Sequence, residues 1–348
     1  MKKIHLLYEY GPDFRPHGSA YIRLLRPLIH PAVQADFEVT TGLVYEGQRV
    51  DVVILDRLWR PDVSLSLVEE LIKQVRLSKA KLVYALDDNF IDMLRQVGDP
   101  RNEERAAIVE TLLSQADFVW VTTQPLMERY KNYNPNILII PNALDERLVI
   151  PRYPKKPNDL FGRKRLTIGF MGTYTHDDDI LMVLPVLEEI CRRYPEEVEF
   201  QLVGAIRQKE NLERVAELPL RIIRPKPDEI EYPLFLMWFT GQVEWDIAIS
   251  PLIENEFNRC KSDIKFLDYC SIGAAGVFSR VPAYQSTVRP FETGILVENR
   301  EESWIEALDR LITEPDLRIE IARSAMIYLF KERTISRCVR NWIDALNH

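Results

Sequence analysis

Three charged residues in the segment CKSDIKFLDYCSIGAAGVFS, residues 260–279, have a spacing that suits anion binding. Lys261, Lys265 and Asp268 are separated by four and then three positions, which places them on one side of a helix. Lysines at a helix N-terminus are unfavourable by themselves, because that end already carries partial positive charge. They become favourable where backbone N–H groups, the helix dipole and two ammonium groups converge on a phosphate. The pattern predicts a phosphate site, and a solvent-exposed Lys265–Asp268 ion pair is the plainer alternative.

The ends of this helix and its acidic residue extend the interpretation. Ser262 is the expected N-cap and Gly273 the expected end of the helix. Asp268 lies about one turn further along, where a carboxylate can accept hydrogen bonds from ribose hydroxyl groups, as acidic residues do in dinucleotide sites.

The elements that must position these residues are short apolar runs that alternate with amphipathic stretches. Segments 66–78 and 104–116 have helical spacing. Buried strands separated by helices predict parallel sheets covered on both faces. The expected strands are 3–8, 50–55, 81–86, 117–123 and 136–141, and then 166–172, 198–204, 220–224, 246–252, 275–279 and 294–299.

The stretch PRYPKKPNDLFGRKR, residues 151–165, interrupts this alternation and is rich in proline and basic residues. We therefore predict an α/β protein with two doubly wound, Rossmann-like domains that face each other across a cleft. The expected divisions are an N-terminal domain over 1–150, a linker over 151–165, a C-terminal domain over 166–325, and a C-terminal helix over 326–348 that packs back toward the N-terminal domain.

Composition and charge exclude several classes of protein. Net charge is −8 with scattered basic residues, which argues against nucleic-acid binding. The 4 cysteines lie far apart, so neither a zinc site nor a disulfide framework is expected, and a reducing cytoplasm is the default. The apolar run LFLMWF, residues 234–239, is far shorter than the ~18 residues of a membrane span. We expect it to be core together with Trp245, and we expect any membrane contact to be peripheral.

Open parallel sheets bind ligands beyond the carboxyl ends of their strands, so functional residues are expected in the loops that follow strands. Asp87 and Asp88 follow the expected strand 81–86, where one carboxylate can bind or help deprotonate a hydroxyl group. The alternative is a turn in which Asp88 or Asn89 caps the next helix. Arg23 and Arg26, after the first strand, are candidates to attract the phosphate of a lipid-linked acceptor or anionic lipid headgroups.

Several motifs occur in an order that resembles a known family. These are YALDDNF, VWVTTQPLMERY…NILIIPNALD, LTIGFMGTYTHDDDILMVLPVLEEI and KSDIKFLDYCSIGAAGVFS…TGILVEN. They cover about two-thirds of the chain, from Lys81 to Asn299. In this order they resemble the retaining GT-B glycosyltransferases of group 1, also called family 4. The more specific likeness is to the branch that builds bacterial surface polysaccharides, including rhamnosyltransferases.

The resemblance implies transfer of a sugar from a nucleotide-diphosphate sugar to a glycan or lipid-linked glycan, with retention, without a metal and without a further cofactor. Lys261 and Lys265 would face the diphosphate, with Asp87 and Asp88 completing the catalytic set. The acceptor would be faced by residues of the loop after the first strand, His17, Gly18 and Ser19. The alternatives are that His17 is a surface histidine and that Ser19 is a helix cap. The residues implied in donor binding are Gly172, Thr173, Tyr174, Arg207, Arg224, Glu256, Asn258, Ser262 and Asp268.

The sequence departs from the family at three points. The family usually has a glutamate before the ribose-binding acid, with seven residues between the two. Here that spacing, counted back from Asp268, reaches Cys260, so Glu254, Glu256 and Asn258 remain candidates to hold sugar hydroxyls. TYTHDDD stands where the family has Arg and Lys after the glycine loop, and Asp replaces a His near residue 87. The acidic run 176–179 could be interpreted as a metal site. We favour helix capping, because acidic residues in a first helical turn are stabilised by the helix dipole.

These departures keep two alternatives open. One is a nucleotide-sugar epimerase of the same fold, which would act on the donor without an acceptor. The other is a non-catalytic subunit that binds a nucleotide sugar or glycan. The base, the sugar, the acceptor, the linkage and the oligomeric state do not follow from the sequence.

Overall fold

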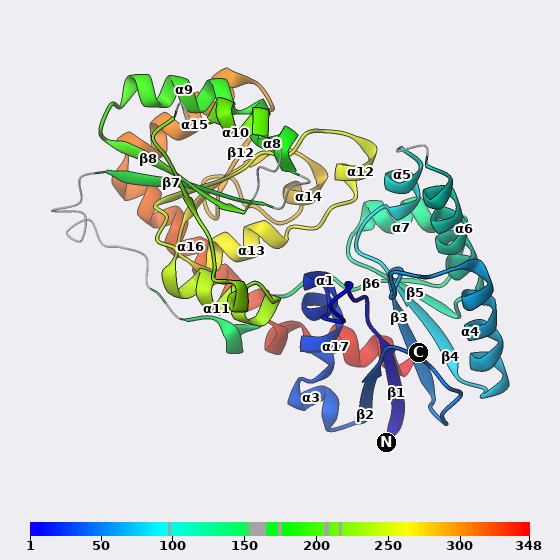
Figure 1. Cartoon of the computed structure of the whole chain (residues 1–348). Coiled ribbons are helices and arrows are strands. Elements are labelled where there is room, and N and C mark those ends of the chain that lie inside the picture. Colours follow the sequence, from blue (N-terminus) through cyan, green and yellow to red (C-terminus); the bar gives the residue numbers. More distant parts are fainter. Residues whose placement is uncertain (97–98, 151, 153–164, 173–175, 205–208, 216–217) are drawn as a thin grey trace. The chain divides into compact units, whose positions relative to one another are not determined.

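The computed structural model describes residues 1–96, 99–150, 152, 165–172, 176–204, 209–215 and 218–348, and the chain forms two compact units. The first unit contains Met1–Asp145, Arg259–Ser262 and Thr334–His348. The second contains Glu146–Asn258 and Asp263–Arg333. Each unit is built on a parallel sheet with helices on both faces (Figure 1).

The sheet of the first unit has six parallel strands in the order β2-β1-β3-β4-β5-β6. Its central strands are runs of Val, Ile and Leu that are buried on both faces, as parallel sheets require. The order reverses between β1 and β3, the kind of switch point at which such sheets bind ligands. The strands are β1 (Lys2–Leu7), β2 (Phe37–Gly42), β3 (Val52–Asp56), β4 (Lys81–Ala85), β5 (Phe118–Val121) and β6 (Ile137–Ile139).

Two apolar clusters cover the faces of this sheet. One is formed with α4 (Leu65–Leu77), α5 (Phe90–Arg95), α6 (Pro100–Gln115) and α7 (Gln124–Tyr130). The other is formed with α17 (Ile335–Asn347) and the segment α1 (Gly18–Ala20), η1 (Tyr21–Leu25) and α2 (Arg26–Leu28), next to α3 (Pro31–Gln34). Side-chain caps begin several helices, such as Ser64, whose hydroxyl accepts from the backbone N–H of Leu67 at the start of α4.

The second unit repeats the design with the strand order β12-β11-β10-β7-β8-β9. The indole of Trp245 fills the space above Gly169, where any Cβ would lie within 1.8 Å of the ring. The strands are β7 (Leu166–Gly172), β8 (Val198–Gly204), β9 (Leu220–Ile223), β10 (Ile247–Ser250), β11 (Ala275–Ser279) and β12 (Ile295–Val297). The helices are η2 (Glu146–Leu148), α8 (Asp177–Met182), α9 (Leu184–Arg193), α10 (Lys209–Val215), η5 (Pro227–Glu229), α11 (Tyr232–Gln242), α12 (Glu256–Arg259), α13 (Ile264–Ser271), α14 (Pro282–Gln285), α15 (Glu301–Thr313) and α16 (Pro315–Glu332).

The observed strands correspond to the expected apolar runs, with one strand missed. The edge strand β2, sequence FEVTTG, buries only Phe37 fully and therefore lacks a recognisable apolar run. The run LFLMWF forms the middle of α11 rather than uniform core, because Leu234 and Met237 are 45% and 42% exposed. Trp245 is buried as expected. The boundary expected at 325/326 falls inside α16.

None of the helices in the described ranges is long and apolar enough to cross a membrane.

Candidate active site

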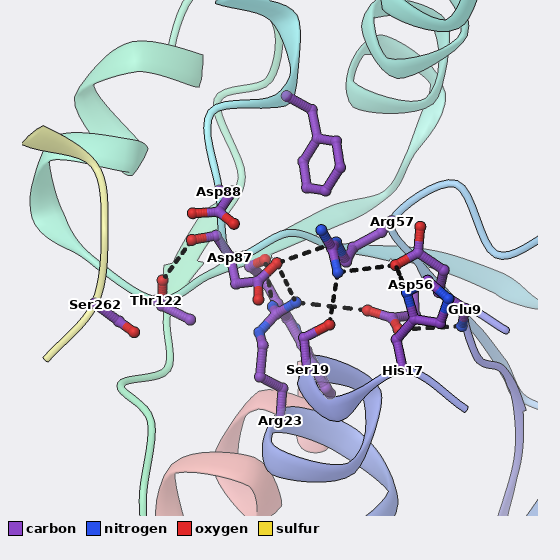
Figure 2. Close-up of polar contacts among 12 residues, drawn as sticks. Glu9, His17, Ser19, Arg23, Asp56, Arg57, Asp87, Asp88, Thr122 and Ser262 are labelled. Atoms are coloured by element: carbon purple, nitrogen blue, oxygen red, sulfur yellow. Dashed lines mark hydrogen bonds and ion pairs between the residues drawn. The ribbon is translucent and has the colours of Figure 1, made fainter. Parts of the chain in front are cut away.

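Charged side chains gather at the carboxyl ends of neighbouring strands in the first unit (Figure 2). Glu9 follows β1. Asp56 is the last residue of β3, and Arg57 comes directly after it. Asp87 and Asp88 follow β4. Parallel strands bring these loops to one edge of the sheet. Together with Arg23 of η1 and Lys261, they form what we call the strand-end cluster: Glu9, Arg23, Asp56, Arg57, Asp87, Asp88 and Lys261.

Arg57 joins three parts of the cluster. Its Nη1 lies 2.8 Å from Glu9 Oε2 and donates a hydrogen bond of 2.7 Å to the hydroxyl of Ser19. Its Nε lies 3.4 Å from Asp87 Oδ1, and its guanidinium stacks 4.4 Å from the ring centroid of Phe90. The residue also holds a φ of 49°, a left-handed conformation that costs free energy in a non-glycine residue and that clusters at functional sites.

Arg23 forms the buried centre of the cluster. Its Nη1 lies 3.6 Å from Asp56 Oδ1 and 3.8 Å from Asp87 Oδ1. The side chain is only 6% exposed, and the indole N–H of Trp342 in α17 donates to its carbonyl oxygen. Arg26 pairs with Asp145 at 2.5 Å. Both arginines that were expected to attract a phosphate are thus already paired with carboxylates.

Several buried polar atoms of the cluster are ion-paired without being hydrogen-bonded. Among the described residues, Arg23 Nη1, Asp56 Oδ1, Arg57 Nε, Asp87 Oδ1 and Glu9 Oε2 have no hydrogen-bond partner. Buried polar groups are normally hydrogen-bonded, and exceptions mark functional sites. In the strand-end cluster these atoms are held by the ion pairs described above, and the parts of the cluster that solvent reaches are the side chains of Asp87 and Asp88.

Burial and neighbouring charges set the protonation of these carboxyl groups. Burial raises the pKa of Asp56 to about 7 although Arg23 opposes the shift, and burial also raises the pKa of Glu9. For Asp87 the effect of burial is outweighed by Arg57, Arg23 and Lys261, so its pKa is lowered. Burial raises the pKa of Asp88, although Lys261 opposes the shift. Asp87 is therefore the carboxyl group of the cluster whose ionised form its neighbours favour.

Lys261 and Ser262 belong to the first unit rather than to the helix on which the sequence placed them. Lys261 Nζ lies 3.7 Å from Asp88 Oδ1, and the hydroxyl of Ser262 accepts a 2.8 Å hydrogen bond from Asn142. The expected helical stripe of three charges is thus wrong. Helix α13 begins only at Ile264, after its N-cap residue Asp263, while Gly273, with φ 70°, follows its end as expected.

Long-range contacts explain why Lys261 and Ser262 lie outside the helix. Asp263 accepts two hydrogen bonds, of 2.7 and 3.1 Å, from the guanidinium of Arg333. Cys260 is buried in the first unit's apolar core, and its carbonyl accepts from the hydroxyl of Thr123. The family that the motifs resemble usually has a glutamate at the position of Cys260, and the buried cysteine has no carboxylate with which to hold sugar hydroxyls.

Lys265 and Asp268 lie together on α13 in the second unit. They are 9% and 7% exposed, so a solvent-exposed ion pair is wrong. Lys265 Nζ lies 4.8 Å from the ring centroid of Phe170, at the end of β7. Burial raises the pKa of Asp268 to about 7, with the charge of Lys265 acting in the opposite direction. A positive side chain thus sits in the first turn of a helix beside a carboxyl group.

Glycines end the neighbouring strands β7 and β8, where the packing leaves no room for a side chain. A Cβ on Gly172 would approach His176 Cβ and the Phe170 ring to 3.1 Å. Gly204 ends the neighbouring strand with φ 87°, and a Cβ there would lie 2.4 Å from the carbonyl oxygen of Gly172. Thr173, Tyr174 and Arg207, also expected to bind donor, lie outside the described residues, as does the linker apart from Arg152 and Arg165.

The remaining expected donor residues are dispersed. Arg224 is exposed after β9, and Glu256 is exposed at the start of α12. Asn258 is buried, and its side-chain N–H donates to the carbonyl of Ile253 at 2.8 Å, which shapes the loop instead.

The acidic run 176–179 fixes the entry to α8. Asp179 accepts a 2.8 Å hydrogen bond from the backbone N–H of Ile253 and lies 2.7 Å from the imidazole of His176. The run therefore connects α8 to the loop after β10. Across the part of the chain that the structure describes, no group of His, Cys, Asp or Glu is arranged to hold a metal ion.

On the expected acceptor side, His17 is the N-cap residue of α1, which begins at Gly18. His17 Nδ1 lies 3.5 Å from Glu9 Oε2. Ser19 is not a cap, because its hydroxyl accepts from Arg57. Sequence reasoning missed Glu9, Asp56 and Arg57, although each ends or follows a strand, and that position alone is the signal that points to them.

No known family profile matches the sequence, and no curated protein matches it. Solved structures share its fold at low identity. HepE (Alr3699) of Anabaena in complex with UDP and glucose has a TM-score of 0.66 and 14% identity over 100% of both chains. Sucrose-phosphate synthase from Thermosynechococcus elongatus has a TM-score of 0.68 and 13% identity over 100% of this chain and 98% of that one.

The pneumococcal O-GlcNAc transferase GtfA in complex with UDP and GlcNAc has a TM-score of 0.57 and 13% identity over 85% of this chain and 56% of its own. These neighbours share the GT-B fold. With two six-stranded parallel sheets, the likeness confirms the predicted GT-B fold.

Proposed function

We propose that the protein is a glycosyltransferase that moves a sugar from a nucleotide-diphosphate sugar to a hydroxyl group of a glycan or glycolipid. The single observation that carries the proposal is the full-length likeness to HepE, which was solved with UDP and glucose. A uridine diphosphate sugar is therefore the first donor to test.

The donor side of the proposal rests on α13. Its first-turn N–H groups, its dipole and Lys265 are suited to a pyrophosphate. Asp268, about one turn further along, is suited to ribose hydroxyls. Gly172 ends β7 on the same unit, and we assign it to the phosphate loop from the motif resemblance; in the structure a side chain there would crowd His176 and Phe170.

The chemical requirement is to stabilise the charge that develops on the departing diphosphate. A prepositioned cation or N–H donor contributes ~2–4 kcal/mol to such a barrier. Lys265 is the side chain we assign to this task, and no metal is needed if it serves. We infer retention of anomeric configuration and a role in bacterial surface polysaccharide synthesis from the motif resemblance described above.

On the acceptor side, we propose that the strand-end cluster orients the reacting hydroxyl. Asp87 is the candidate to receive or polarise its proton, because the pKa of Asp87 is lowered and it remains a carboxylate at neutral pH. His17 and Ser19 border the cluster through Glu9 and Arg57. Lys261 is assigned to this side through its pairing with Asp88.

A screen of nucleotides and nucleotide sugars tests the proposal. UDP, GDP, dTDP and their sugars are added to the full-length protein, and the melting temperature is recorded, because a ligand that binds the native state raises it. Samples with the best donor are then analysed by mass spectrometry for released nucleotide. We expect a shift with one nucleotide class and slow donor hydrolysis, both lost in Lys265→Met. No shift with any nucleotide contradicts the function.

One observation keeps a second candidate in view. Cys260, at the position of the family's first glutamate, is buried in apolar core and cannot contact a sugar. A non-catalytic nucleotide-sugar-binding subunit would show the same thermal shift but neither hydrolysis nor transfer. Conversion of the donor to its epimer in the same samples would identify an epimerase.

A further inference from the structure

We propose, building on the function above, that the strand-end cluster takes an uncharged, polyhydroxylated acceptor and discriminates against one that carries a phosphate beside the reacting hydroxyl. The inference concerns the chemical class of the acceptor. It follows from how the cations of the cluster are paired, from its charge balance, and from which of its carboxylates solvent can reach.

Each cation of the cluster is already paired with a carboxylate. Arg57 lies 2.8 Å from Glu9 and 3.4 Å from Asp87. Arg23 lies between Asp56 and Asp87, and Lys261 lies 3.7 Å from Asp88. A phosphate would have to displace one of these partners and leave a buried carboxylate without its cation, which is strongly unfavourable.

The charge balance of the cluster also opposes an anion. Its four carboxyl groups, from Glu9, Asp56, Asp87 and Asp88, face three cations, a formal sum of 3 − 4 = −1. Because the pKa of Asp56 is about 7, its protonation brings the sum between −1 and 0 at neutral pH. Neither value attracts a phosphate, and like charges placed together at an interface are costly.

The same cluster suits hydroxyl groups, which donate and accept at once. Arg23 and Arg57 lie 3.8 and 3.4 Å from Asp87 Oδ1 and hold this carboxylate in place, and Lys261 does the same for Asp88 at 3.7 Å. The side chains of Asp87 and Asp88 are 15% and 23% exposed, so a ligand from solvent can reach them. Asp87 lies beside Arg23 and Arg57, with Asp88 next to it (Figure 2). Two adjacent carboxylates can accept hydrogen bonds from neighbouring hydroxyls of a sugar ring.

Matched pairs of simple sugars test the inference on the full-length protein. Saturation-transfer NMR is recorded with the methyl glycosides of glucose, galactose and rhamnose, and with a phosphorylated form of each. We expect at least one neutral glycoside to bind and its phosphate ester to bind at least tenfold more weakly, a difference of about 1.4 kcal/mol. Equal or tighter binding of the phosphorylated member overturns the inference, and so does the absence of binding by all the neutral glycosides.

Two variants assign the signal to the cluster. Asp87→Asn should abolish binding of the neutral glycoside. Asp92→Asn is the matched control, because Asp92 lies in the following helix and pairs with Arg129 at 2.6 Å outside the cluster. Loss of binding in both variants, or in neither, contradicts the assignment.

Calorimetry with UDP on the same preparations separates this inference from the proposed function. UDP binding together with a preference for the phosphorylated sugar would refute the acceptor class alone. Neutral sugar binding without affinity for any nucleotide would refute the glycosyltransferase while leaving the sugar site standing.

Discussion

The two units present charge at the carboxyl ends of their sheets in opposite ways. In the first, three cations and four carboxyl groups neutralise one another through ion pairs of 2.8–3.8 Å. In the second, Lys265 and Asp268 sit on a helix whose first turn adds its own partial positive charge, beside strands that end in glycine. A neutralised network is suited to orient a neutral polar molecule, whereas a lysine at a helix N-terminus is suited to an anion. The same sheet topology thus supports two different ligand chemistries.

The largest expected effect tests the second region. Lys265→Met keeps an apolar stem over Phe170 but removes the charge that we assign to the leaving diphosphate. We expect turnover to fall by about 10²- to 10³-fold, as for the loss of one oxyanion donor. Turnover is measured as nucleotide release. Lys331→Met, on an exposed position of α16, is the matched control and should remain active. If Lys265→Met loses stability in proportion to activity, the lysine is structural.

The next effect tests whether the first region is a true network. Arg57→Met leaves Glu9 and Asp87 without their shared partner, so the free energy of unfolding should fall by about 3 kcal/mol. Urea denaturation measures this. Arg57→Lys should recover only part of the loss, since an ammonium group cannot reach Ser19, Glu9 and Asp87 together.

A surface pair in the same unit supplies the reference for that measurement. Arg76 and Asp117 form a 2.8 Å ion pair with partly exposed side chains, so Arg76→Met should cost less than about 1 kcal/mol. Similar losses for Arg57→Met and Arg76→Met would show that the strand-end cluster is an ordinary surface network.

A pH-dependent effect sharpens the comparison at Asp268. Burial raises its folded-state pKa from 3.8 to about 7, so the folded protein binds this proton more tightly than the unfolded chain. The contribution of Asp268 to stability is therefore full below about pH 4 and is lost as pH rises through 7. The side chain of Asp268→Asn cannot ionise. The free energy of unfolding of the variant minus that of the parent should therefore be ~1–3 kcal/mol larger at pH 8.5 than at pH 5. Denaturation at the two pH values measures this. If variant and parent differ in stability by the same amount at both, the pKa of Asp268 is not raised.

The smallest effect concerns the segment that changes unit. Ser262→Ala removes the hydrogen bond from Asn142, which should lower the free energy of unfolding by about 1 kcal/mol. UDP affinity, measured by calorimetry, should stay unchanged because this hydroxyl is engaged in the first unit. A tenfold loss of UDP affinity would restore Ser262 to the donor site.

Much of the fold follows from local sequence. Strand β3 is a run of Val, Ile and Leu, and such runs separated by amphipathic helices specify a doubly wound sheet through burial alone. Only the half-exposed edge strand β2 escaped, because its apolar signal is weak. Asp87 and Asp88 were found because the residues after a parallel strand converge at one sheet edge. Arg57 follows the same rule, yet nothing in its immediate neighbours marked it.

The sequence by itself determined two doubly wound units and the helix that carries Lys265 and Asp268, because apolar periodicity and helix-end chemistry act over a few residues. Only the tertiary structure decided which charges meet. The contact of Asp263 with Arg333 spans 70 residues. Asp263 is the N-cap residue of α13, so the helix starts after Lys261 and does not include it. The pairing of Lys261 with Asp88 likewise joins distant segments. Electrostatic partners are chosen by distance in space, and chain spacing does not encode that distance.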